Sequence, residues 1–185
     1  ISAQDCMEIF IGKTVRSEAA RIQAHTGKPL TDAWMAAFYK RRNVRLEAEL
    51  QAIDGALDAV AAVHARLGGR IACASGADRY KVEMQLQKVG LAPYFAGRVF
   101  SGHEMPATKP APDVYLAAAA ALGVPPQRCL VVEDTVTGVT AGVAAGATVV
   151  GLCPSPVGHG SPEALRAAGA VQVLAHLREL PALLG

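Results

Sequence analysis

The sequence has few aromatic residues and almost no net charge. Phenylalanine, tryptophan and tyrosine make up 5% of the 185 residues, and 18 basic against 16 acidic side chains leave a formal net charge of +2 at pH 7. Proteins that bind nucleic acid usually concentrate positive charge, often beside aromatic side chains that stack on bases. We therefore expect no nucleic-acid partner.

Long apolar stretches are lacking too, since no run reaches the roughly 18 residues that a membrane-spanning helix requires. No positively charged leader followed by an apolar segment opens the given sequence. The four cysteines are scattered and form no C-x-x-C pair, so we expect buried thiols rather than disulfides or a metal site. These absences predict no membrane partner and a reducing, cytoplasmic location; a monomer is favoured, with the oligomeric state left open.

What the sequence does contain is enough apolar content for an ordered core. Hydrophobic residues make up 51% and charged residues 18% of the chain, and a chain of this length can form one good core with a small appended module. To about residue 52 the pattern is helical, and Thr31 is placed to cap a long helix that carries Trp34, Phe38 and Leu46. We expect no strand in this part.

From Gly55 onward, helices alternate with short apolar strands. We expect helices over 57–67, 78–89, 112–122, 138–145 and 162–168, strands over 70–74, 99–100, 129–132, 148–152 and 171–174, and a closing helix. Near-continuous apolar strands separated by helices indicate a parallel sheet covered on both faces. The predicted fold class is therefore α/β, a doubly wound, Rossmann-like parallel sheet over residues 54–185 with a small helical part over residues 1–53.

In such sheets a ligand binds beyond the carboxyl ends of the strands. Ser75 and Gly76 follow the first expected strand, Glu133 and Asp134 follow the third, and Lys109 lies between them, ahead of a proline-led helix. Adjacent carboxylates are costly unless a cation or hydrogen-bond donors meet them; the plainer alternatives are a helix cap for the acids and a surface lysine. A hydroxyl, a lysine and paired acids are the groups that phosphoryl transfer with a divalent cation needs.

Three segments together resemble the second, third and fourth motifs of the haloacid-dehalogenase-like (HAD) superfamily. They are IACAS, which ends at Ser75, TKPAPDVYL, which contains Lys109, and CLVVEDTVTGVTAGVAAGATVVGL, which contains Glu133 and Asp134. VGLAPYFAGRVFSG is also similar to the segment that members carry between the second and third motifs. Within the superfamily these segments look most like phosphatases and mutases of the beta-phosphoglucomutase and phosphogluconate-phosphatase type.

The resemblance implies a role for each of these residues. Ser75 and Lys109 would be catalytic and, with Gly76, would bind the phosphate. Asp134 would ligate Mg²⁺, and Glu133 would ligate it directly or through water. Gly76 stands where the family commonly has a polar residue, so one side-chain donor is lost.

The helical first part resembles the mobile cap of the family. Gly12, Lys13 and Arg16 fall where related proteins present substrate-selecting residues. The plainer alternative for these three is the start of a helix with solvated cations.

One part of the family's pattern does not occur in the given residues. Members begin with a strand that ends in Asp-x-Asp, whose first aspartate attacks phosphorus and whose second serves as general acid and base, and no apolar run here ends in this way. The resemblance places that strand at the centre of the sheet, between the strands that end at Ser75 and at Val132. We expect the natural protein to begin a few tens of residues upstream; a chain that truly began at Ile1 would be catalytically dead.

The sequence therefore predicts a Mg²⁺-dependent phosphatase that acts on a small phosphorylated metabolite, a sugar phosphate by resemblance, through an aspartyl-phosphate intermediate. A phosphosugar mutase, which returns the phosphoryl group to a sugar instead of to water, is one alternative. A non-catalytic binding protein that has kept the fold and lost the nucleophile is another.

Overall fold

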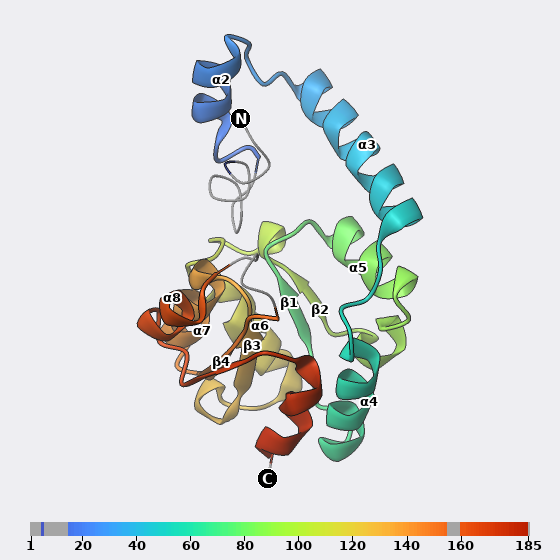
Figure 1. Cartoon of the computed structure of the whole chain (residues 1–185), viewed down its shortest axis with the longest axis vertical. Coiled ribbons are helices and arrows are strands. Elements are labelled where there is room, and N and C mark those ends of the chain that lie inside the picture. The colour runs from blue at the N-terminus through green and yellow to red at the C-terminus, as the bar shows by residue number, and fades with distance from the viewer. Residues whose placement is uncertain (1–4, 6–14, 155–159, 185) are drawn as a thin grey trace. The chain divides into compact units, whose positions relative to one another are not determined.

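The computed structural model describes residue 5 and residues 15–154 and 160–184 (Figure 1). Contacts between Cα atoms divide the chain into two compact units, Ile1–Leu50 and Gln51–Gly185, each of which is described by itself. The boundary lies three residues before the division that the sequence pattern predicts. Among the described helices, none combines the length and the apolar character needed to cross a membrane.

The described part of the first unit is helical, with α2 (Ala19–Thr26) followed by α3 (Asp32–Glu49). Thr31 caps α3 as predicted, because its hydroxyl accepts the backbone N–H of Trp34 at 3.2 Å. Trp34 and Phe38 lie one turn apart on this helix, and their rings stack with centroids 5.4 Å apart. The expected helical character of this unit is therefore observed over α2 and α3.

The second unit alternates helices and strands, and the strand pairs among its described residues are all parallel, which confirms the predicted α/β class. Its elements are α4 (Ala56–Arg66), β1 (Cys73–Ser75), α5 (Arg79–Lys88), η1 (Ala92–Phe95), β2 (Val99–Ser101), η2 (Gly102–Glu104), α6 (Asp113–Leu122), η3 (Pro126–Arg128), β3 (Leu130–Glu133), α7 (Val136–Ala144), β4 (Thr148–Leu152), α8 (Pro162–Ala167), β5 (Gln172–Leu174) and η4 (Leu177–Leu184). The predicted closing helix is a 3-10 helix, which contains Pro181, a residue without a backbone N–H to donate.

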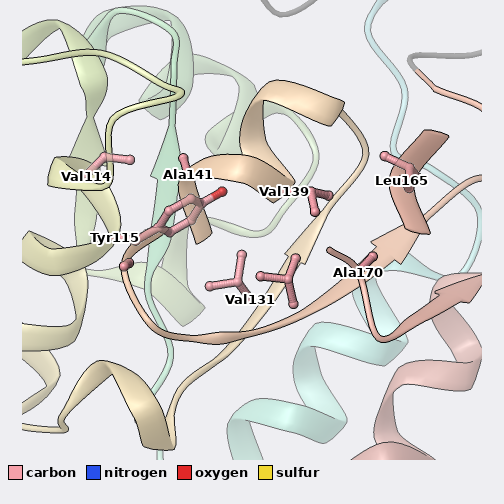
Figure 2. Close-up of a cluster of buried hydrophobic side chains, with 9 residues drawn as sticks. Val114, Tyr115, Val131, Val139, Ala141, Leu165 and Ala170 are labelled. Atoms are coloured by element: carbon pink, nitrogen blue, oxygen red, sulfur yellow. The ribbon is translucent and has the colours of Figure 1, made fainter. Parts of the chain in front are cut away.

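The strand β4 is buried on both faces because helices cover both sides of its sheet. On one face Val149 belongs to a cluster with side chains of α6, α7 and α8, most of which are labelled in Figure 2. On the other face Val150 and Leu152 pack with Leu180 of η4 and with the half-buried Val63 of α4. This two-sided burial is the physical reason for the continuous apolar pattern of the strand.

The helix α7 lies unusually close to the strands beneath it. A Cβ placed on Gly142 would lie 2.7 Å from Cγ2 of Val149 and 3.3 Å from Cγ1 of Val131. Glycine is therefore required at this position, since any larger side chain would push the helix away from β3 and β4.

An apolar cavity separates the two sheets of the second unit. Among the described residues β1 pairs only with β2, whereas β3 pairs with β4 and β4 with β5. A cavity of about 560 Å³ is lined by Ala74 of β1, Val132 of β3, Val60 of α4 and Leu180 of η4, among others. The parallel sheet is interrupted between β1 and β3, which is where the family resemblance places the strand that ends in Asp-x-Asp.

The cysteines depart in part from the expectation of buried thiols. Cys73, Cys129 and Cys153 form no disulfide but are half-buried, because each lies at or beside an end of a short strand. Burial raises the pKa of the thiols of Cys73 and Cys129, so both remain protonated at neutral pH. Cys6 lies outside the described residues.

Candidate active site

Lys109 bridges β1 of one sheet and the carboxyl end of β3 of the other. Its Nζ donates a hydrogen bond to the backbone oxygen of Ala74 in β1 at 3.3 Å, and it forms an ion pair with Oε1 of Glu133 at the end of β3. Only 10% of the Lys109 side chain and 9% of the Glu133 side chain are exposed. The ammonium is therefore a held, largely desolvated charge at the interruption of the sheet, and the surface-lysine alternative is excluded.

Both oxygens of the Glu133 carboxylate accept hydrogen bonds from protein groups. Oε1 accepts from Lys109 and from the hydroxyl of Tyr115, the latter at 2.5 Å. Oε2 accepts the backbone N–H of Asp134 at 3.1 Å, the N–H of Thr135 at 3.3 Å and the Thr135 hydroxyl at 3.1 Å. The buried acid is thus stabilised by a cation, a phenol and the start of the following helix.

The same contacts set the protonation states of this cluster. Burial alone would raise the pKa of Glu133, but the Lys109 ammonium and the hydrogen bonds from Lys109, Tyr115 and Thr135 outweigh it and leave the pKa below its ordinary value. Burial, together with the neighbouring Glu133 carboxylate, raises the pKa of Tyr115. At neutral pH the acid is therefore ionised and the phenol is protonated, as their hydrogen bond requires.

Gly138, in the first turn of α7, leaves the space that Glu133 occupies. A Cβ placed on Gly138 would lie 2.0 Å from Cδ of Glu133 and 2.1 Å from Oε2, which is far inside van der Waals contact. The backbone N–H of Gly138 also donates to the hydroxyl of Thr135 at 3.0 Å, so Thr135 caps α7 while it holds the acid. Sequence reasoning did not connect Gly138 with Glu133; the available signal was a glycine five residues after a strand-end acid.

The turn after β1 is held from the neighbouring strand. The Ser75 hydroxyl accepts the N–H of Ala77 at 3.2 Å. Its register partner Ser101 in β2 is fully buried, and the Ser101 hydroxyl donates to the backbone oxygen of Ala77 at 2.7 Å and accepts the N–H of His103 at 3.2 Å. Sequence reasoning missed Ser101, although its position at a strand end was a usable signal.

Four of the predicted site residues lie at the ends of β1 and β3 or contact them. Lys109 and Glu133 are in direct contact, Asp134 follows Glu133 at the same strand end and is half-buried, and Ser75 adjoins Ala74, whose backbone oxygen Lys109 contacts. Gly76 is exposed, and a Cβ there would meet no atom within 4 Å, so the glycine is not required for packing.

The predicted cap residues are only partly described. Gly12 and Lys13 lie outside the described residues. Arg16 forms an ion pair with Asp32 of α3 at 3.1 Å, with 70% and 93% of the two side chains exposed. Such an exposed pair contributes little to stability, so Arg16 can exchange this partner for another anion at low cost.

The carboxylate of Asp134 is compatible with binding a hard cation whose other ligands are waters and substrate oxygens. Among the described residues, no group of three or more histidine, cysteine, aspartate and glutamate side chains could hold a metal ion. Mg²⁺, however, is commonly held by only one or two carboxylates together with waters and substrate phosphates. Asp134 supplies one carboxylate of this kind next to the end of β3. Both oxygens of Glu133 accept hydrogen bonds from protein donors.

Comparison with known proteins gives consistent matches. A family model described as haloacid dehalogenase-like hydrolase matches residues 2–146. The 6-phosphogluconate phosphatase of Escherichia coli is 31% identical over 146 residues, which cover 78% of this chain and 62% of the relative. Protein CbbY of Rhodobacter capsulatus is 34% identical over 153 residues, which cover 78% of this chain and 66% of the relative. The chain thus spans less than two thirds of the length of these curated relatives.

Solved structures match over the whole chain. A conserved haloacid dehalogenase-like protein of unknown function from Agrobacterium tumefaciens is 33% identical with a TM-score of 0.81, and the match covers 100% of this chain and 82% of that one. A HAD family hydrolase from Deinococcus radiodurans, solved with bound phosphate and sodium, is 29% identical with a TM-score of 0.77, covering 100% of this chain and 80% of that one. Since the family model covers most of the residues and the parallel α/β fold agrees, the chain belongs to the haloacid dehalogenase-like hydrolase family.

Proposed function

We propose that the protein is a phosphatase that hydrolyses a phosphoric monoester of a small metabolite, with sugar phosphates as the substrate class. The observation that carries the proposal is the Lys109 ammonium, which is held between the ends of β1 and β3 beside two acids. A fixed, desolvated cation at the carboxyl end of a parallel sheet suits a transferring phosphoryl group. The similarity to 6-phosphogluconate phosphatase supports the substrate class.

The residues of this chain would bind and orient the phosphoryl group. Lys109 offsets negative charge that is shared by the phosphoryl oxygens and the attacking carboxylate, and the Ser75 hydroxyl donates to one of those oxygens. Asp134 would hold Mg²⁺, which supplies charge neutralisation for the phosphoryl oxygens when it is bound. Glu133 acts mainly as the anion that fixes Lys109.

We propose that the nucleophile is an aspartate outside residues 1–185, on the strand that would fill the interruption between β1 and β3. Its carboxylate attacks phosphorus, the metabolite alcohol leaves with a proton from a neighbouring acid, and water then hydrolyses the aspartyl phosphate to release inorganic phosphate. Both the apolar lining of the cavity and the greater length of the relatives support this assignment.

Substrate selection would rest with the first unit. Arg16 is the described residue that we propose for this role, with Gly12 and Lys13 beside it in sequence. A guanidinium with an exposed, weakly held partner suits an anionic or hydroxylated substrate group that varies between metabolites.

The test is an assay of phosphate release by the natural gene product that contains these residues. A panel of sugar phosphates would be tested with Mg²⁺ and with excess chelator, and the products would be separated by chromatography. Phosphate release that depends on Mg²⁺ is expected. An isomeric sugar phosphate as product would establish a mutase instead, and a folded protein that binds sugar phosphates without turnover would establish the non-catalytic alternative.

A further inference from the structure

Tyr115 places a hydroxyl where packing alone requires none. It lies in the first turn of α6, is 8% exposed, and its ring belongs to the buried cluster in Figure 2. A phenylalanine would fill the same apolar space. The hydroxyl nevertheless makes two hydrogen bonds to charged groups, accepting from Nζ of Lys109 at 2.8 Å and donating to Oε1 of Glu133 at 2.5 Å.

Tyr115 completes the set of partners around the Lys109 ammonium. The ammonium has three N–H donors, and they are met by the backbone oxygen of Ala74, the hydroxyl of Tyr115 and Oε1 of Glu133. Nζ also lies 4.6 Å from the centroid of the Tyr115 ring. A lysine side chain is a flexible stem with a point charge, so three acceptors in fixed positions are what restrict it to one geometry.

We propose that Tyr115 is a positioning residue that fixes the Lys109 ammonium and the Glu133 carboxylate relative to each other between β1 and the end of β3. Its hydroxyl bonds both groups at once, so neither can move alone. Without the hydroxyl, one ammonium proton and one lone pair of Oε1 lose a buried partner, and the ammonium gains freedom to leave the position between β1 and β3.

The consequence for catalysis rests on the proposed phosphatase function. Electrostatic stabilisation of a transferring phosphoryl group depends on a charge that is already in place, so a displaced ammonium lowers the rate of the chemical step. Tyr115 acts through Lys109 and contributes no group to the substrate, so its loss should lower kcat more than it changes KM.

The decisive variant is Tyr115→Phe, which removes one oxygen and keeps the ring. Its matched control is Tyr94→Phe in η1, because the Tyr94 ring packs edge-on against His64 with centroids 5.4 Å apart, apart from the Lys109 cluster. Thermal unfolding of both variants checks that the fold is intact.

The first measurement does not require activity. In nuclear magnetic resonance spectra of protein with ¹⁵N-labelled lysine, an ammonium held by three acceptors exchanges its protons slowly and gives a separate signal, which is assigned to Lys109 by its absence in Lys109→Arg. We expect this signal to shift or broaden in Tyr115→Phe and to remain in Tyr94→Phe. An unchanged Lys109 signal in Tyr115→Phe would overturn the proposal.

The second measurement is kinetic and uses the natural gene product with its preferred sugar phosphate and saturating Mg²⁺. Tyr115→Phe is expected to lower kcat by about 10- to 100-fold, by analogy with the range typical for outer-shell hydrogen-bond partners of metal ligands, with KM changed by no more than about twofold. Wild-type kcat in Tyr115→Phe would refute the positioning role. If the wild-type protein releases no phosphate at all, the proposed function fails, and the Lys109 signal alone still decides whether Tyr115 positions it.

Discussion

Replacing Gly138 with alanine is expected to destabilise the fold through one side chain, Glu133. The new Cβ would lie 2.0 Å from Cδ and 2.1 and 2.3 Å from the two carboxylate oxygens, so the carboxylate must move and give up its contacts with Lys109, Tyr115 and Thr135. Breaking a buried ion pair costs about 3–5 kcal/mol, and alanine in a helix gains about 1 kcal/mol over glycine. The expected net loss is about 2–4 kcal/mol in the free energy of unfolding.

The measurement is urea unfolding of Gly138→Ala in two backgrounds. In the wild-type background the full loss is expected. In a Glu133→Ala, Lys109→Met background, both charges are absent, neither is left buried alone, and the carboxylate that blocks the new Cβ is gone. There the same substitution should be neutral or stabilising by up to about 1 kcal/mol.

An exposed glycine outside the helices is the control for a substitution without a clash. Gly76→Ala places a Cβ where no atom lies within 4 Å, so its free energy of unfolding should change by less than about 0.5 kcal/mol. The reasoning is refuted if Gly138→Ala loses the same free energy in both backgrounds, because the clash would then not involve Glu133.

Three further predictions concern the charged residues of the site. Lys109→Ala should lower kcat by about two to three powers of ten with cooperative unfolding retained, and Lys109→Arg should restore only part of the rate; wild-type turnover in Lys109→Ala would contradict the role of the ammonium. Asp134→Asn should remove most Mg²⁺-dependent phosphate release, and full activity of the wild type in excess chelator would exclude a metal requirement. The pKa of Glu133 is lower in the folded protein than its unfolded value of about 4.3, so its contribution to stability is complete above that value and is lost as pH falls through the folded pKa. Glu133→Gln should therefore flatten the acid side of the curve of unfolding free energy against pH. Equal slopes in both proteins would argue against this contribution.

Much of the second unit could be predicted because its signals are local. The strand Thr148–Leu152 has the predicted bounds. A short, continuous apolar run between two helices is typical of a buried parallel strand. Thr31 caps α3 as its position before a helical pattern indicates. The family and the order of elements followed from such patterns together with the motifs around Lys109 and Glu133.

Other features depended on contacts between residues distant in sequence. The sequence placed Lys109 and Glu133 at one edge of the sheet, but it could not show that a tyrosine 18 residues before Glu133 joins them, nor that a glycine opens the space for the acid. Hydrophobic periodicity reports only which face of an element is buried. The partner of a buried polar group is chosen by how helices and strands pack in three dimensions, so only the tertiary structure assigned Glu133 to Lys109, Tyr115 and Thr135.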